Sequence, residues 1–168
     1  MIRSFNGKTP KVAESALVSE TAYIIGDVEI GENSSVWPGA VVRGDNGHIK
    51  IGANTAIEDN SVLHDAVEIG DNVVIGHSVV VHHSQIGNNT LVGSHAIILD
   101  DAQIGSFCVI AAGCVVTPRM KIPDNSFVVG VPAEIKGELS QEQRSGLERR
   151  GASGFNAKLA RQYKEQGF

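Results

Sequence analysis

Histidines cluster in one part of the chain at a spacing that is unusual for a metal site. The stretch GHSVVVHHS (76–84) contains three of the chain's six histidines, and His64 lies eighteen residues before His82. Imidazole nitrogens bind zinc and other transition metals, so the cluster is a candidate metal site. Ligands on one face of a helix would be three or four residues apart. A different element must therefore bring residues eighteen positions apart together.

An aliphatic residue at every sixth position indicates what that element is. Two positions before each of these stands a residue that is mostly Ser, Thr, Ala or Cys. Residues two apart point to the same side of a strand, so the chain must turn between one such pair and the next. The aliphatic positions form three phased runs, which are Val12, Val18, Ile24, Ile30, Val36 and Val42, then Ile51, Ile57, Leu63, Ile69, Ile75 and Val81, and finally Ile86, Val92, Ile98, Ile104, Ile110, Val116 and Ile122.

This period of six resembles the hexapeptide repeat of left-handed β-helices, in which three hexapeptides form one triangular coil of eighteen residues. The resemblance covers about residues 12–122 and implies an all-β fold, a left-handed parallel β-helix with a C-terminal α-helix. An antiparallel sandwich would show a period of two without the period of six. We predict a single domain, with the β-helix over about residues 12–130 and a helical segment over about 138–166.

Two breaks in the phase fall near the candidate functional residues. Nine residues separate Val42 from Ile51, and the insertion lies in RGDNGHIK (43–50), where we expect a loop to bulge. Five residues separate Val81 from Ile86, so one residue is missing where His82 and His83 stand. Departures from local regularity are expected at functional sites.

The C-terminal segment has the signals of a helix that packs along the β-helix. Ser140 followed by Gln143 reads as a capping box. Gly146, Gly151 and Gly154 weaken the helical pattern, so we expect one interrupted helix or two short ones.

The coil explains the interval of eighteen. His64 and His82 each follow a core aliphatic residue, so they point outward from one face of successive coils, about 4.8 Å apart. Two imidazoles at that separation can share one metal ion. His77 lies almost one side of the triangle away, and the neighbouring subunit of a symmetric trimer would bring it to the pair. Three histidines with an open position are typical of catalytic zinc.

The chain resembles the γ-class carbonic anhydrase family in four segments. They are VWPGAVVRGD (36–45), IKIGANTAIEDNSVLH (49–64), IGHSVVVHH (75–83) and LVGSHAIILDDAQIG (91–105). The resemblance implies reversible hydration of carbon dioxide to bicarbonate by a metal-bound hydroxide in a homotrimer with sites at the subunit interfaces. It implies His64, His77 and His82 as the ligands of zinc, or alternatively of iron(II) or cobalt.

The resemblance also implies roles for four polar residues. Arg43 and Asp45 match an Arg-Gly-Asp that holds the interface near the site, and Asp59 matches a carboxylate of the same network. Glu58 stands where many members have a Gln that bonds the metal-bound water. A carboxylate there disfavours formation of hydroxide, so we expect weak activity at neutral pH.

The proton-transfer group of the family has no direct counterpart. Asn46 follows RGD where the archetype has an acid, and no long acidic insertion is present. Candidate substitutes are His48, His83, Asp65 and Glu68, although His48 and His95 taken singly read as solvated or structural histidines.

Two other functions stay open. A hexapeptide acyltransferase shares the coil but needs one catalytic histidine, and acetyl-CoA binding without metal would distinguish it. A metal-binding scaffold or siderophore-related homologue would keep the ligands with little hydratase activity.

Bulk properties limit the partners. A net charge of -5 argues against nucleic acid, and no apolar run reaches a membrane span. Two cysteines without a secretory signal predict a cytoplasmic protein, with Cys108 and Cys114 as buried, inert thiols.

Overall fold

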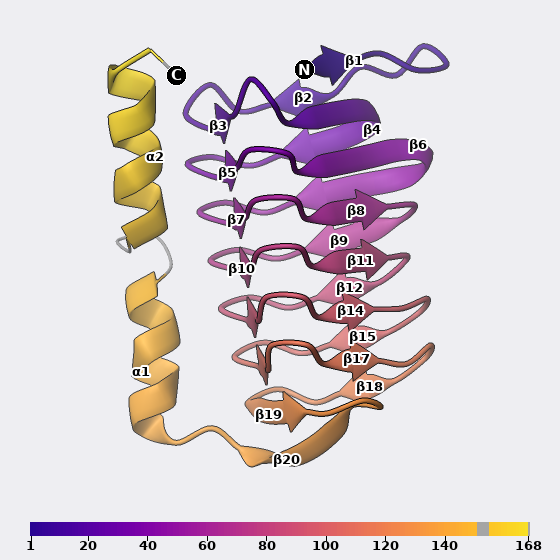
Figure 1. Ribbon diagram of the computed structural model, residues 1–168, viewed down its shortest axis with the longest axis vertical. Helices are drawn as coiled ribbons and strands as arrows, with labels where there is room; N and C mark the ends of the chain where they lie inside the picture. Colours follow the sequence, from indigo (N-terminus) through magenta and orange to yellow (C-terminus); the bar gives the residue numbers. More distant parts are fainter. Residues whose placement is uncertain (151–154, 168) are drawn as a thin grey trace.

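Parallel strands stacked on three faces form the body of the molecule (Figure 1). The computed structural model describes residues 1–150 and 155–167, and the chain winds as a left-handed β-helix, as the sixfold repeat predicts. Strands one coil apart pair in parallel, for example Leu63 with Val81.

The strands of each face are short because the chain turns after a few residues. The first face contains β1 (Ile2–Arg3), the first halves of β4 (Tyr23–Ile30) and β6 (Val41–Ile51), β8 (Val62–His64), β11 (Val80–His82), β14 (Ile97–Ile98) and β17 (Val115–Val116). The second contains β2 (Lys11–Val12), the second halves of β4 and β6, β9 (Val67–Ile69), β12 (Gln85–Ile86), β15 (Gln103–Ile104) and β18 (Lys121–Ile122). The third contains β3 (Leu17–Val18), β5 (Ser35–Val36), β7 (Ala56–Ile57), β10 (Val74–Ile75), β13 (Leu91–Val92), β16 (Val109–Ile110) and β19 (Ser126–Val129).

The repeated aliphatic residues fill the prism that the three faces enclose. Ile57, Leu63, Ile75 and Val81 are fully buried, and the same cluster continues through most of the other repeat positions. The small inward residues also join the coils. Ser61, for example, donates to the carbonyl of Gly76 at 2.7 Å. The hydroxyls that share the core thus satisfy backbone groups that the narrow turns leave unpaired.

Asparagines form many of the corners. Asn54, Asn72 and Asn89 have φ angles of 54°, 57° and 54° in the left-handed region, where Asn is favoured over most other residues. These corners keep the turns tight, so that neighbouring coils stay in register.

The nine-residue interval does not form the expected loop. Residues 43–50 belong instead to the eleven-residue strand β6, which bends from the first face onto the second. Along β4 the chain advances two residues from Gly26 to Val28, while their partners on β6 advance five, from Gly44 to Ile49. The loop prediction was wrong because the extra residues widen a corner and remain in extended backbone.

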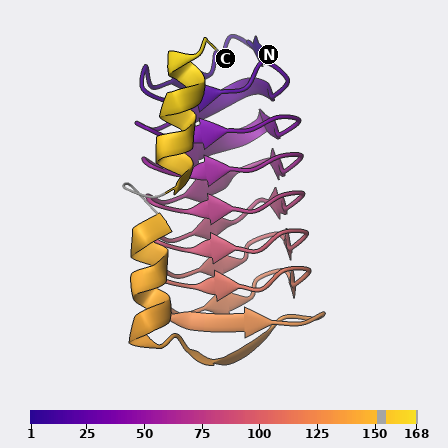
Figure 2. The same cartoon turned by 60° about the vertical axis from the view of Figure 1, so that its left-hand side comes forward.

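The C-terminal segment forms a strand and two helices. β20 (Glu134–Glu138) pairs antiparallel with β19 and closes the last coil. α1 (Gln141–Arg150) and α2 (Phe155–Glu165) run along the third face (Figure 2). Two short helices are one of the two alternatives that the sequence predicted; Gly151 and Gly154 lie outside the described residues.

The contacts of the helices are local and specific. The capping box is present, with the amide of Ser140 donating to Oε1 of Gln143 at 2.8 Å and the amide of Gln143 donating to Oγ of Ser140 at 3.2 Å. α2 packs on β3 and β5, where Tyr163 meets Trp37 edge to face at 5.2 Å. No helix in the described part of the chain is long and apolar enough to span a bilayer.

Candidate metal centre

Two of the three candidate ligand histidines lie side by side on the first face. β8 ends at His64 and β11 ends at His82, and the two residues are register partners, as the coil count predicts. Their ring centroids are 5.0 Å apart and the rings are tilted by 57°. Arg43 precedes them in the same column on β6. Three charged or titratable side chains thus project from successive coils.

Asp45 connects Arg43 to His64. Its Oδ2 accepts a hydrogen bond from Arg43 at 2.8 Å, and its Oδ1 lies 3.3 Å from Nε2 of His64. Desolvation of Asp45 acts to raise the pKa of its carboxyl, but the hydrogen bond and charge of Arg43 outweigh it, so the pKa is lowered. Oδ1 is buried and has no hydrogen-bond partner in the described part of the chain. The predicted Arg43–Asp45 pair is therefore present beside the histidines.

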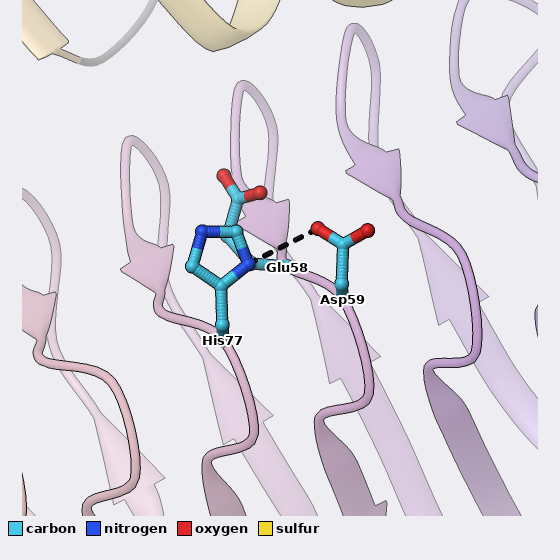
Figure 3. A group of neighbouring side chains, drawn as sticks. All are labelled: Glu58, Asp59 and His77. Carbon is cyan, nitrogen blue, oxygen red and sulfur yellow. Dashed lines mark hydrogen bonds and ion pairs between the residues drawn. The ribbon is translucent and has the colours of Figure 1, made fainter.

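His77 lies on a different side of the coil, with Asp59 and Glu58 (Figure 3). It follows β10 on the third face, and its Nδ1 is 3.1 Å from Oδ2 of Asp59, one coil earlier. Within the described residues of one chain, the group of three potential ligand atoms within 4.8 Å of one another is Glu58, Asp59 and His77. His77 therefore does not join His64 and His82 within a single subunit.

Glu58 is half-buried and shares the coil of Asp59, with its backbone amide donating to Ile75 at 2.9 Å. Figure 3 shows its carboxylate beside the His77 ring. Glu58 is therefore placed to act on an ion that His77 binds.

Asp100 is a candidate site residue that the sequence analysis missed. Its Oδ1 lies 2.6 Å from Nδ1 of His82, and this hydrogen bond is the main reason why the pKa of Asp100 is lowered. The coil after His82 is seventeen residues long in register, so Leu99 is level with His82, and only the position one residue beyond Leu99 could have pointed to Asp100.

Two of the proposed proton-transfer substitutes lie near one another at the corner after the histidines. His83 has Nδ1 3.6 Å from Oδ2 of Asp65 and Nε2 3.4 Å from Oδ1 of Asp101. Asp65 also accepts a hydrogen bond from Asn46 at 3.1 Å. Desolvation acts to raise the pKa of Asp65, but the bonds from Asn46 and the amide of Ala66 outweigh it, so the pKa is lowered.

His48 and Glu68 have different surroundings. Nδ1 of His48 is 3.2 Å from Oδ1 of Asp27, whose carboxylate also pairs with Lys8. His48 lines a cavity of about 340 Å³ that also contacts Asp45. Glu68 is exposed on the second face between Lys50 and Gln85. Glu68 is therefore not brought to the site, whereas His48 is near its edge.

The donor atoms suit a zinc or iron(II) ion. His82 and His77 each use Nδ1 for a carboxylate, which leaves Nε2 of each ring. Nε2 of His64 lies 3.3 Å from Oδ1 of Asp45 without a hydrogen bond between them. Imidazole nitrogens held by carboxylates are common in zinc sites. The buried Oδ1 of Asp45 provides negative charge beside the pair. The chemistry of these residues therefore fits the ion that the resemblance implies.

The cysteines have no part in this centre. Cys108 and Cys114 are buried and free, and desolvation raises the pKa of both thiols. They are buried core residues, as expected from their place in the repeat.

The fold and the stacked corners define a hexapeptide-repeat β-helix protein. The family model described as the GMPPB C-terminal domain matches residues 46–142. The chain therefore belongs to this hexapeptide-repeat family.

Two solved structures are similar over nearly the whole chain. The BC4754 gene product of Bacillus cereus, provisionally described as an acetyltransferase, has 35% identity and a TM-score of 0.93, with 98% of this chain and 97% of that chain covered. A hexapeptide transferase family protein from Anaplasma phagocytophilum has 34% identity and a TM-score of 0.93, with 96% and 97% covered.

A curated relative matches over a shorter segment. A carbonic anhydrase from Geobacillus kaustophilus is 46% identical over 63 residues, which are 38% of this chain and 35% of the relative. The aligned segment thus spans about a third of that relative's length.

Proposed function

We propose that this chain forms a homotrimer that hydrates carbon dioxide reversibly to bicarbonate. His64 and His82 of one subunit and His77 of the next hold a zinc ion, or alternatively iron(II) or cobalt, at each interface. The observation that carries this proposal is the in-register pair of His64 and His82 with the Arg43–Asp45 pair beside it. The likeness to the Geobacillus carbonic anhydrase supports the activity.

An apolar strip on the first face supports assembly. The strip consists of outward residues in register along the coils, and Val80 within it is 36% exposed. It runs next to the column that contains His64 and His82, while α2 packs on β3 and β5 of the third face. Exposed apolar surface of this kind favours a subunit interface. The residues of the apolar strip are Tyr23, Val41, Val62, Val80, Ile97 and Val115.

The residues of the chain orient the donors and balance the charge. When bound, the ion supplies a hydroxide nucleophile at neutral pH by lowering the pKa of water. Asp59 holds the His77 ring through Nδ1, and Oδ1 of Asp45 lies 3.3 Å from Nε2 of His64 as a nearby negative charge. Arg43 keeps Asp45 ionised, so the site carries a fixed negative charge next to the imidazoles.

Metal analysis combined with a stopped-flow hydration assay tests the proposal. We expect close to one zinc or iron ion per chain and a rate of carbon dioxide hydration that falls by two orders of magnitude or more, roughly, when His82→Ala removes a ligand. A full complement of metal with no hydration above the buffer rate would contradict the enzymatic proposal and favour a metal-binding scaffold.

Acyl transfer is the second candidate, because the two structures that match over nearly the whole chain are named as transferases. Calorimetric titration with acetyl-CoA distinguishes the two. Binding of acetyl-CoA by a metal-free protein would favour acyl transfer, and our proposal predicts metal binding without affinity for acetyl-CoA.

A further inference from the structure

Each candidate ligand histidine lies beside one aspartate, and His77 and His82 are hydrogen-bonded to theirs. Asp59 bonds His77 at 3.1 Å, Asp45 approaches His64 at 3.3 Å, and Asp100 bonds His82 at 2.6 Å. Asp45 and Asp59 lie in segments that resemble known motifs for this network. Asp100 has no role in the function described above, although its contact is the shortest of the three.

We propose that Asp100 is a positioning residue for His82. It holds the ring with the proton on Nδ1, so that Nε2 stays unprotonated and available to a metal ion. This inference rests on the proposed function only for the identity of what Nε2 binds.

The geometry of the contact supports this role. A carboxylate can only accept, so a hydrogen bond from Nδ1 at 2.6 Å requires the proton on that nitrogen. The separation is slightly shorter than the range of about 2.7–2.9 Å for an N–H group that donates to an ionised oxygen, so the contact is a close one. The side chains of His82 and Asp100 are 35% and 50% exposed, and mobile water does not hold an imidazole ring in one orientation. The hydrogen bond from Nδ1 to Asp100 therefore fixes the orientation of the His82 ring.

The physical consequence concerns both the tautomer and the ring orientation. A neutral imidazole carries its proton on one nitrogen, and the partner of that nitrogen decides which one it is. Loss of such an outer carboxylate typically weakens metal binding by about 10–100-fold.

Asp101 provides a matched control. It is adjacent in sequence and is also an exposed carboxylate, but it contacts Nε2 of His83 at 3.4 Å. Asp101→Ala removes the same charge from the same turn without touching His82.

Two measurements on the full chain test the proposal. Nitrogen NMR of the metal-free protein at about pH 8, above the ordinary pKa range of free histidine, reports the tautomer of His82. Competition titration with zinc reports affinity. We expect an Nδ1–H tautomer in the wild type and in Asp101→Ala, and mixed tautomers in Asp100→Ala. Zinc binding should weaken about 10–100-fold in Asp100→Ala and less in Asp100→Asn, whose amide oxygen still accepts.

The outcomes separate this inference from the proposed function. A His82 tautomer that is unchanged in Asp100→Ala overturns the positioning role. Equal loss of zinc affinity in Asp100→Ala and Asp101→Ala also overturns it, because a general charge effect would then suffice. A wild type that binds no zinc but shows an Asp100-dependent tautomer supports the positioning role and contradicts the proposed metal centre.

Discussion

Single residues set the charge around the candidate centre. Arg43, Asp45, Asp59 and Asp100 surround the three histidines with one cation and three carboxylates, each through a defined contact. Glu58 adds a fourth carboxylate beside His77. Two substitutions that each remove one charge test this arrangement.

Glu58→Gln should move the pH–rate profile of carbon dioxide hydration to lower pH. The carboxylate lies beside His77, and negative charge near a bound ion disfavours ionisation of its water. Neutralising it should increase the rate at neutral pH by up to about tenfold, the factor that corresponds to one pKa unit. The measurement is stopped-flow hydration at high buffer concentration with metal content confirmed. A superimposable profile would refute the charge argument.

Arg43→Gln should reduce stability at neutral pH and leave it unchanged in acid. The pKa of Asp45 is lowered in the folded state, so its ionisation stabilises the fold above the unfolded pKa of about 3.9. That stabilisation is lost as the pH falls through the folded pKa. The difference between wild type and variant should be roughly 1 kcal/mol or less at neutral pH, because the pair is partly exposed. Urea unfolding of the metal-free proteins from about pH 7 to 3 measures this difference in the free energy of unfolding. A difference that increases as the pH falls would contradict the prediction.

The coil is the element that makes the site. Strands β8 and β11 place Leu63 and Val81 inward and His64 and His82 outward, so the core and the centre share two strands. The stability of the β-helix comes from the packing of aliphatic residues between coils.

Leu63→Ala should destabilise the chain by roughly 2–5 kcal/mol, because it leaves a cavity in a fully buried layer. Val62→Ala, one residue earlier on the outward side, should cost little in subunit folding and weaken association instead. Denaturant unfolding measures the change in stability, and sedimentation measures the change in association. The strand assignment fails if Val62→Ala destabilises folding as much as Leu63→Ala.

The elements could be predicted from the sequence because one period controls them. A slip of one residue would expose every aliphatic side chain of a coil, so the register of His64 and His82 follows from the pattern. The corner at residues 43–50 could not be predicted, because the repeat gives the number of extra residues and not their path. Asp100 was missed for a related reason. The coil after His82 is shortened by one residue, so Leu99 is level with His82 and Asp100 reaches it from the turn.

The whole molecule separates His77 from the other two histidines. One chain holds His77 at the third face with Glu58 and Asp59, and His64 with His82 at the first. The apolar strip lies on the face of the pair, which is where a second subunit would dock. The trimer, the metal and the shared centre remain predictions.

Mixing defective subunits tests the shared centre most directly. One partner carries His77→Ala and the other carries His64→Ala with His82→Ala, so neither forms a complete centre alone. After unfolding and joint refolding in equal amounts, about one quarter of the sites in a cyclic trimer should combine the intact halves. We predict that high-affinity zinc binding and hydration return to about a quarter of the wild-type level. Mixed trimers with no recovery of zinc binding, or a monomer with wild-type affinity, would contradict the account.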